Sequence, residues 1–365
     1  MKRRAFLFRS LAALGHLGIG VSATAQNKSG APSVSIAAAG DTVLGFNLQD
    51  HFDEQLSLGR TRAELFDLYG RGIRDVLGAA DIAIVNLECP FTERGEKLAK
   101  NFNFRARPEM VEVLKRASID AVTVANNHAM DYGVDGMTDT RTTLDNAGIG
   151  HFGTGEDLAS ARRPLIVERN GLRIGFLGYY FQTQEDMREP PQIYALPGKP
   201  GASGCYTDLQ WIKAMVSEDV AALAADVDAA IPFFHWGKES QYQVQDYQIE
   251  IAQLCIRRGA RAVLGAHPHR LQGVQVFDGA PIFYSLGNFI YGGVKNPGDT
   301  LTMIAQLTVE RERVTASVVP AQFTNWPDAP FQPFVLQGEA RTRGLARIAE
   351  LSAGFRHTLP MLRGA

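Results

Sequence analysis

Two histidines lie one residue apart, at His267 and His269, shortly after the apolar run Ala262–Leu264. Because side chains alternate faces in an extended backbone, both imidazoles are expected to point the same way at the end of a buried strand. Neutral imidazole is the commonest metal ligand among protein side chains. The pair therefore predicts half of a metal site, whose other ligands must come from elsewhere in the chain.

Four other apolar runs end in polar groups that could bind a metal. They end at Asp41, at Glu88, at the cluster Asn126–His128 and at His235. In α/β proteins ligands bind outside the carboxyl ends of strands, so these runs can deliver their side chains to one place. Each residue alone has an ordinary interpretation as a turn, cap or core residue, but together they predict a metal centre. The predicted metal ligands are Asp41, Glu88, Asn127, His235, His267 and His269.

Oxygen and nitrogen ligands of this kind suit one or two divalent ions of a borderline metal, such as Mn, Fe or Zn. Such an ion lowers the pKa of a bound water and polarises a phosphoryl or carbonyl oxygen. A pair of close ions needs a bridging carboxylate, for which Glu88 is the candidate. His128 is predicted to protonate the leaving group as a general acid. The alternative for His128 is a hydrogen bond to a metal ligand.

Further polar residues near these strand ends are predicted to support the ligands or the substrate. Asp131 is placed to hold a histidine ring in the required tautomer. Glu239 is predicted to orient a ligand or to bind substrate amines, and Asn288 to line the same mouth. Asn86 and Asn126 are also expected to contact a ligand or the substrate. Asp131 and Glu239 also have ordinary interpretations as loop or cap residues.

Strand-like and helix-like segments alternate through much of the chain, which favours a stacked α/β architecture. Asn-Gly and Asp-Gly pairs at 170–171 and 278–279 predict hairpins. The Pro/Gly-rich loop 190–203 is too long for a simple connector and is predicted to be a lid or surface flap. The order predicts one domain of two packed sheets with helices outside. The predicted helices are 62–77, 108–117, 135–146, 208–225, 245–257 and 339–351.

The first 25 residues read as an export signal rather than as part of the fold. A basic start is followed by a short apolar stretch and by the small residues Ala23-Thr24-Ala25, and residues 26–32 are a flexible lead-in. Arg3-Arg4 also resembles a twin-arginine signal. The alternatives are an ordinary secretory signal and a retained membrane anchor. The protein is therefore predicted to be exported to the periplasm or cell envelope, with no transmembrane segment in the mature chain.

Charge and cysteine content narrow the class of protein further. Without residues 1–25, which hold four basic residues and no acids, the chain has 33 basic and 39 acidic residues, a formal charge of −6. That charge disfavours a general nucleic-acid binder, which would carry a basic face. The odd number of cysteines argues against a disulfide scaffold. Cys89 and Cys255 are predicted to be core residues, while Cys205 lies in a loop and could be free.

These segments, taken together and in order, resemble the CapA family of bacterial capsule (poly-γ-glutamate) synthesis proteins. The resemblance runs from about Val34 to Tyr291. The motifs that carry it are Gly40-Asp41-Thr42-Val43-Leu44-Gly45, Asn86-Leu87-Glu88, Ala125-Asn126-Asn127-His128 with Asp131 and Gly133, His235-Trp236-Gly237 with Glu239, Gly265-Ala266-His267-Pro268-His269 and Tyr284-Ser285-Leu286-Gly287-Asn288-Phe289.

The CapA family resembles the calcineurin-like metallophosphoesterases, which implies a four-layer αββα sandwich of two mixed β-sheets flanked by helices. The resemblance implies that residues 33–325 form this domain and that 326–365 are a C-terminal extension with a peripheral helix. It also implies a two-metal site in which Glu88 stands where the superfamily has a bridging Asp, and His128 is the general acid. One position departs from the pattern, because the superfamily's Asp-x-His motif has Val43 in place of its histidine.

Two functions are compatible with the sequence. The first is an exported metal-dependent hydrolase that cleaves a phosphoester or amide bond during synthesis of a cell-envelope polymer. The second is a non-catalytic accessory protein that binds an anionic polymer during capsule assembly or export. The expected partners are an anionic polymer or phosphoester substrate and the capsule synthesis or export machinery, with no nucleic acid.

Overall fold

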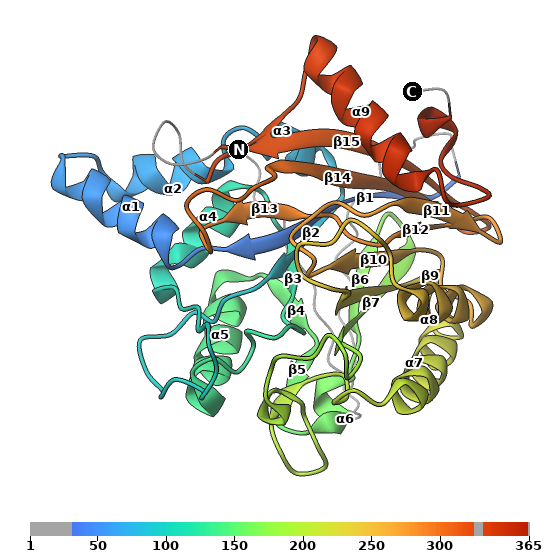
Figure 1. The fold of residues 1–365 in the computed structure, drawn as a ribbon, viewed down its shortest axis with the longest axis horizontal. Helices are drawn as coiled ribbons and strands as arrows, with labels where there is room; N and C mark the ends of the chain where they lie inside the picture. The colour runs from blue at the N-terminus through green and yellow to red at the C-terminus, as the bar shows by residue number, and fades with distance from the viewer. Residues whose placement is uncertain (1–30, 325–330, 364–365) are drawn as a thin grey trace, which may run out of the picture.

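Two β-sheets pack face to face at the centre of the protein, which we describe from a computed structural model for residues 31–324 and 331–363 (Figure 1). The first sheet has eight strands in the order β16-β15-β14-β1-β2-β3-β4, with β13 paired beside β1. The second has six strands in the order β11-β12-β10-β9-β7-β6. Both mix parallel and antiparallel neighbours, as the sequence predicted. The export signal predicted over residues 1–25 lies outside the described residues.

The strands vary from two to eleven residues. Those of the first sheet are β1 Ser33–Val43, β2 Ile82–Leu87, β3 Ala121–Thr123, β4 Gly150–Phe152, β13 Asn288–Tyr291, β14 Leu301–Glu310, β15 Val314–Phe323 and β16 Pro333–Val335. Those of the second are β6 Leu165–Arg169, β7 Leu172–Phe181, β9 Ala229–Trp236, β10 Val263–Ala266, β11 Val274–Phe277 and β12 Ala280–Phe283. A separate small pair is formed by β5 Thr154–Gly155 and β8 Gly201–Ala202.

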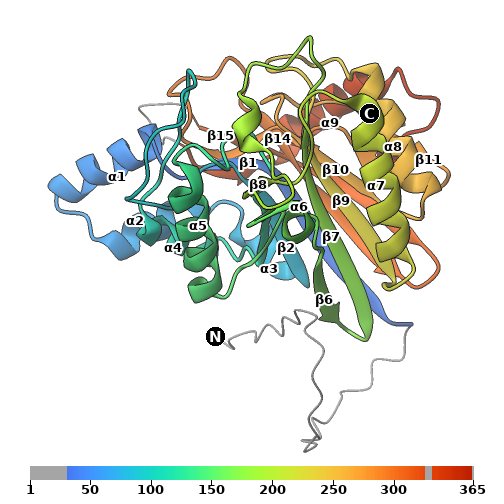
Figure 2. The same ribbon diagram turned by 90° about the horizontal axis from the view of Figure 1, so that it is seen from below.

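Helices cover the outer faces of both sheets (Figure 2). The α-helices are α1 Asn47–Ser57, α2 Arg62–Gly70, α3 Arg74–Ala79, α4 Val111–Arg116, α5 Gly133–Ala147, α6 Leu158–Ala161, α7 Leu209–Ala224, α8 Asp246–Arg257 and α9 Gly338–Ser352. Short 3₁₀ turns lie at Pro108–Met110, Pro191–Ile193 and Pro360–Leu362. Within the described ranges, no helix combines the length and apolar character needed to cross a membrane.

Three buried apolar clusters show that the layers follow the predicted order of helices, sheet, sheet and helices. Alternation along β1 sends Ile36 and Ala38 into the cluster between the sheets, and Ala37 and Ala39 into the cluster beneath α1–α5. A third cluster joins the second sheet to α7 and α8. The structure thus confirms the four-layer sandwich.

The helices differ in detail from the sequence prediction. The single helix expected over 62–77 is wrong, because the segment forms α2 and α3 with a break after Gly70. A side chain at Gly72 would come within 2.4 Å of the Pro333 carbonyl oxygen, so the chain turns where β16 packs closely against it. Helix α1 is not among the predicted helices, although it buries Leu48 and Phe52. All three cysteines are buried and none is in a disulfide.

Candidate metal centre

The predicted metal ligands converge where the carboxyl ends of strands from both sheets meet. Strands β1, β2 and β3 run parallel in the first sheet, and β9 and β10 run parallel in the second. Two groups of side chains that could hold an ion share Glu88. The groups are Asp41, Glu88 and His235, and Glu88, His267 and His269, and the atoms that could bind an ion lie within 4.8 Å of one another in each group.

The position of Asp41 depends on a close crossing of backbones. Strand β1 pairs with β14 as far as Ala38 and then with β13, so that Asp41 lies beside Asn288. The amide of Asp41 donates to the Gly287 carbonyl at 2.9 Å. A Cβ at Gly40 would lie 1.8 Å from that same carbonyl oxygen. Only glycine therefore fits at position 40, and it lets the two strands approach and fix the buried Asp41.

The two histidines of the initial pair converge by a different route from the one predicted. Strand β10 ends at Ala266, and His267 and His269 have φ values of 99° and 54°. The expected extended backbone is therefore wrong, since both residues occupy the left-handed region, which is costly for side chains other than glycine. This turn lets the His267 amide donate to Asp41 Oδ2 at 3.1 Å. The strained turn, and not strand alternation, brings the imidazoles to the cluster.

Glu88 is the central carboxylate and the clearest indication of a cation-binding site. It is fully buried, and neither of its oxygens accepts a hydrogen bond from any described residue. His235 Nε2 is 3.3 Å and His269 Nε2 3.8 Å from Glu88 Oε1. Buried polar atoms are almost always satisfied, so an exception calls for an unseen water or ion. The unpartnered oxygens and the surrounding imidazoles fit a divalent cation.

Asn127, His235 and His267 form one side of the cluster. His235 Nε2 is 2.7 Å from Asn127 Oδ1 and 2.9 Å from His267 Nδ1. The other nitrogen of the ring, Nδ1, is 3.1 Å from the amide nitrogen of Asn86, which can only donate. That hydrogen bond makes Nδ1 the acceptor, so Nε2 carries the proton of the neutral ring and donates to Asn127 Oδ1.

Asn86 and Asn126 form hydrogen bonds that connect predicted site residues. Both side chains are buried. Asn86 donates to Asp41 Oδ1 at 2.8 Å, and Asn126 donates to Asn86 Oδ1 at 3.1 Å. Asn126 Oδ1 in turn accepts from the amide of His128 at 3.1 Å. This chain of amides ties the ends of three adjacent strands together.

His128 lies beside the cluster with one ring nitrogen already bound. Its Nδ1 is 2.6 Å from Asp131 Oδ2, and its ring stacks on Phe104 at 4.0 Å between centroids. Only Nε2 can therefore reach a substrate. Burial and then the charge of Lys100 lower the pKa of His128 well below its usual value. Burial raises the pKa of Asp131 to about 7, although Lys100 opposes this.

Asn288 and Glu239, the last two predicted residues, lie differently. Asn288 Oδ1 is 2.8 Å from His269 Nδ1, and its buried Nδ2 has no hydrogen-bond partner among the described residues. Glu239 is exposed. Its charge raises the pKa of Glu88 and of His269, but only as a minor cause. Asn288 thus belongs to the cluster, whereas Glu239 acts on it through its charge.

The carboxylates and His269 have strongly altered pKa values. Burial and then the charge of Asp41 raise the pKa of Glu88. Burial would lower the pKa of His269, but Glu88 and Asp41 outweigh it and hold this pKa at about 10. Burial likewise raises the pKa of Asp41, but the hydrogen bond and charge of His269 lower it overall. In the metal-free protein Asp41 and His269 thus stabilise each other's charged forms.

Sequence reasoning missed several residues that touch the cluster. Gln182 Nε2 is 2.8 Å from His267 Nε2, and the Tyr291 hydroxyl is 3.4 Å from His269 Nε2. Gln182 directly follows strand β7. It could have been found by the pattern that indicated the other ligands, a polar residue after an apolar run. Lys100 and Glu189 lie in loops and carried no comparable signal.

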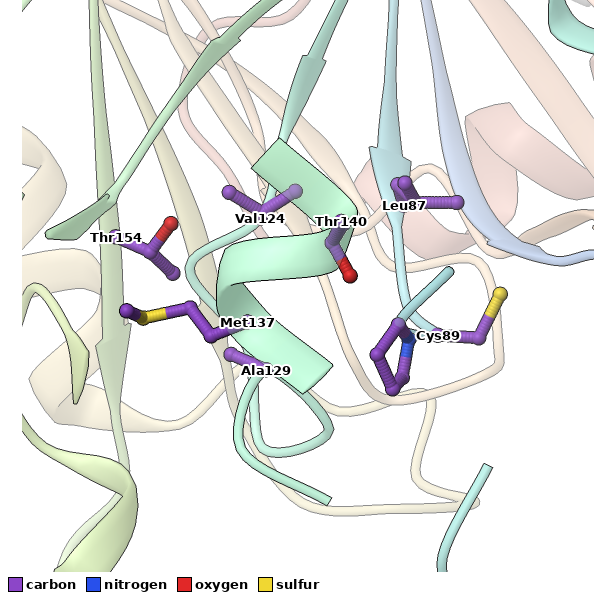
Figure 3. Close-up of a pocket in the computed structure, with 8 residues that line it drawn as sticks. Leu87, Cys89, Val124, Ala129, Met137, Thr140 and Thr154 are labelled. Atoms are coloured by element: carbon purple, nitrogen blue, oxygen red, sulfur yellow. The ribbon is translucent and has the colours of Figure 1, made fainter. Parts of the chain in front are cut away.

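A small pocket lies against α5, apart from the metal-binding candidates (Figure 3). None of the predicted site residues lines it. Its lining residues are Leu87, Cys89, Pro90, Val124, Ala129, Met137, Thr140 and Thr154. Most of these side chains are apolar, so the pocket is a packing gap beneath the helix rather than part of the site.

A two-sheet sandwich with carboxylates, an amide and imidazoles gathered at its strand ends defines a metallophosphoesterase-like protein. Within that class, the family model described as "Bacterial capsule synthesis protein PGA_cap" matches residues 35–292. The chain belongs to this family of bacterial capsule synthesis proteins, as the resemblance to CapA proteins predicted.

Relatives from three bacteria match the chain in part. It is 32% identical over 222 residues to the PGA biosynthesis protein CapA of Bacillus subtilis (strain 168), covering 60% of this chain and 55% of that protein. It is 28% identical over 245 residues to the capsule biosynthesis protein CapA of Bacillus anthracis, covering 65% and 58%. A probable polyglutamine synthesis accessory protein of Mycobacterium tuberculosis (strain ATCC 25618 / H37Rv) is 31% identical over 228 residues, covering 59% and 57%. The chain spans somewhat over half the length of these relatives.

Solved structures resemble the chain only weakly. A hypothetical protein from Thermus thermophilus matches with a TM-score of 0.44 and 14% identity, covering 78% of this chain and 99% of that one. A second protein of the same organism, TT1561, matches with a TM-score of 0.40 and 8% identity, covering 78% and 98%. Likeness at this level adds nothing to the fold observed directly.

Proposed function

We propose that this protein is a metal-dependent hydrolase that cleaves a phosphoester or amide bond during synthesis of a capsule polymer. The observation that carries the proposal is the buried Glu88 carboxylate, which has no hydrogen-bond partner among the described residues and lies between two sets of imidazoles. A carboxylate of this kind has little structural value unless it binds a cation.

The proposed ligands divide into two overlapping sets. By the resemblance to metallophosphoesterases, which regroups the close side chains described above, one set is Glu88, Asn127, His235 and His267, and the other is Asp41, Glu88 and His269. When bound there, a divalent ion would lower the pKa of water toward neutrality and polarise a phosphoryl or carbonyl oxygen. The second set has fewer protein ligands, because Val43 stands where a histidine is usual. Asn288, which contacts His269, is the residue best placed to supply the missing ligand.

His128 is the proposed proton donor to the leaving group. Its Nδ1 is held by Asp131, so the proton that moves to the substrate is carried at Nε2. Stacking on Phe104 fixes the plane of the ring and therefore the direction of Nε2. Burial lowers the pKa of His128 and raises that of Asp131, so the two groups titrate as a coupled pair.

The biological setting of the proposal comes from the relatives. Two of them are named as CapA proteins of PGA or capsule biosynthesis. We therefore expect the substrate to be an anionic envelope polymer, such as poly-γ-glutamate, or a phosphoester precursor of one. The export signal proposed for residues 1–25 would place the protein in the periplasm or cell envelope, with the capsule synthesis machinery as its partner.

A second function, binding of an anionic polymer without catalysis, is favoured by two observations. The histidine usual at the position of Val43 is absent, which weakens one of the two ligand sets. One relative is named as an accessory protein of polyglutamine synthesis. In this alternative the cluster holds a metal only to organise the binding surface, and His128 has no role in proton transfer.

Metal content and a histidine variant distinguish the two functions. We expect elemental analysis of the natively produced protein to find one or two equivalents of Mn, Fe or Zn. His128→Ala should keep the metal and lose hydrolysis of phosphoester and γ-glutamyl amide substrates by roughly 10²–10⁴-fold. His151→Ala is the control, because His151 pairs with Asp145 and has no contact with the cluster. A metal-loaded wild type that hydrolyses neither substrate class, but binds poly-γ-glutamate, would favour the accessory role.

A further inference from the structure

Lys100 is a buried cation. It contacts two carboxylates that in turn contact the predicted site residues His128 and Asn127. Only 2% of its side chain is exposed. Its Nζ is 2.8 Å from Asp131 Oδ1, 3.0 Å from Glu189 Oε2 and 2.7 Å from the Asn127 carbonyl oxygen. Lys100 therefore donates a hydrogen bond to the Asn127 carbonyl and forms ion pairs with the two carboxylates.

Each acceptor of Lys100 controls a different part of the site. Asp131 uses its other oxygen to bind His128 Nδ1 at 2.6 Å. Glu189 uses its other oxygen to accept from Asn127 Nδ2 at 3.4 Å, which orients the Asn127 amide so that its oxygen faces His235. The ammonium of Lys100 thus contacts the proposed proton donor through one carboxylate and a proposed metal ligand through the other.

Lys100 also joins segments that are far apart in the sequence. It lies in the loop between β2 and α4, Asp131 precedes α5, and Glu189 belongs to the 182–208 segment that follows β7. The Lys100 loop further encloses Asp131, because the Leu98 amide donates to its carbonyl and the Phe104 amide to its side chain. Charged groups buried among apolar side chains interact more strongly than exposed ones.

The 182–208 segment forms one wall of the site. Gln182 contacts His267, and Glu189 contacts Asn127. An apolar cluster, including Met130, Met187 and Tyr194, packs the same segment against the residues that follow β3. Two ion pairs also hold the segment, Lys100 with Glu189 and Lys238 with Asp186. The long loop predicted as a lid or flap over 190–203 is continuous with this anchored wall.

We propose that Lys100 is a positioning residue. It orients Asp131 behind His128 and Glu189 behind Asn127, and it anchors the 182–208 segment against the site. The consequence for proton transfer rests on the proposed function, whereas the consequences for metal binding and for the segment do not. The Lys100 side chain is too buried to contact a substrate itself.

Lys100→Met removes the charge and keeps most of the length of the side chain. We expect it to weaken Mn²⁺ binding by about 10–100-fold, the usual effect of removing a group that orients a metal ligand. In the metal-free protein, amide hydrogen exchange should increase in peptides from the 182–208 segment and stay unchanged in α7 and α8. Lys213→Met is the matched control, because Lys213 pairs with Glu250 at the surface of the α7–α8 layer.

The conservative variant Lys100→Arg separates orientation from simple stability. It keeps the positive charge and several donors, so Mn²⁺ affinity and slow exchange in the segment should be largely restored. Since Lys100→Met leaves two carboxylates without their cation, it could fail to fold. Glu189→Gln is then the decisive variant, because it weakens the same anchor while leaving Lys100 and Asp131 paired, and it should speed exchange in the same segment.

The outcomes are distinguishable from those of the proposed function. Folded Lys100→Met, or Glu189→Gln in its place, with wild-type Mn²⁺ affinity and wild-type exchange would overturn the role of Lys100. If the wild type binds no Mn²⁺, the proposed hydrolase fails, but exchange in the 182–208 segment still decides whether Lys100 anchors it. A loss of thermal stability without a change in either measurement would show a purely structural ion pair and would also overturn the proposal.

Discussion

Glu88 and His269 have raised pKa values in the metal-free protein, so a cation that binds there competes with protons. Both pKa values are raised, that of Glu88 by burial and the charge of Asp41, and that of His269 to about 10 by Glu88 and Asp41. Metal ligands bind in their deprotonated forms. We therefore expect Mn²⁺ affinity to increase as the pH rises above neutrality. Calorimetry in two buffers of different ionisation enthalpy should show different heats, and equal heats would contradict proton release.

The stability of the metal-free protein should depend on pH in the opposite sense. A raised pKa in the folded state contributes stability that is complete below the unfolded value and is lost as pH rises through the folded value. For His269 that window extends from about 6.5 to about 10. The Tm of chelator-treated protein should therefore fall across this range, and saturating Mn²⁺ should remove the trend. A flat profile without metal would show that His269 is not held in its charged form.

Asn288 offers a test of the ligand set formed by Asp41, Glu88 and His269, in which Val43 stands where a histidine is usual. Its Oδ1 is 2.8 Å from His269 Nδ1, and the strand pairing places it beside Asp41. If it completes this set, Asn288→Ala should stay folded but bind one metal ion in place of two. Asn146→Ala, on the exposed face of α5, is the control. Stoichiometry that is equal in both variants would exclude Asn288 as a ligand.

Residue types after apolar runs predicted much of the candidate site, but not its geometry. Asp41, Glu88 and His235 could be recognised because each interrupts an apolar segment. The positive φ of His267 and His269 could not, since it depends on the turn after β10. Lys100 and Glu189 meet only through tertiary folding, and nothing in their local sequence indicates a shared partner.

At the scale of elements, the crossing of β1 and β13 controls the position of Asp41. Gly40→Ala would place a methyl group against the Gly287 carbonyl. We expect a loss of about 1–3 kcal/mol in unfolding free energy, as for other overpacked sites, together with weaker Mn²⁺ binding. Gly354→Ala is the control, because no atom lies within 4 Å of the added carbon. Denaturant unfolding and Mn²⁺ titration of both variants would check this, and normal metal binding in Gly40→Ala would contradict it.

Elements with strong periodicity were predicted well, while those set by packing were not. Helix α5 and the hairpin at Asn170-Gly171 follow from an apolar repeat and a turn pair that act locally. The break between α2 and α3 depends on the close approach of β16, which lies near the other end of the chain. The α1 helix is mostly polar and presents only a narrow buried face, so its periodic signal is weak.

For the whole molecule, the C-terminal residues complete the core between the sheets. Ile348 of α9 and Leu359 are buried there, and the Val276 amide donates to the His357 carbonyl at 2.9 Å. Ile348→Ala should therefore lower stability by about 2–5 kcal/mol. Mn²⁺ affinity below the melting temperature should not change, because α9 has no contact with the metal-binding candidates. Arg343→Ala, on the exposed face of α9, is the control for chemical denaturation, and a matching loss in that variant would contradict the core role.

The candidate ligands come from both sides of the sandwich. Asp41, Glu88 and Asn127 lie at the carboxyl ends of strands of the first sheet, whereas His235, His267 and His269 lie at those of the second. A bound ion would therefore link the two sheets, in addition to the hydrogen bonds that already join them here. A free ion concentration of 100 times the Kd adds about 2.7 kcal/mol to the free energy of unfolding. Here that stabilisation would oppose separation of the sheets. The metal concentration in the surrounding medium would thus set how strongly the two sheets are held together at this edge.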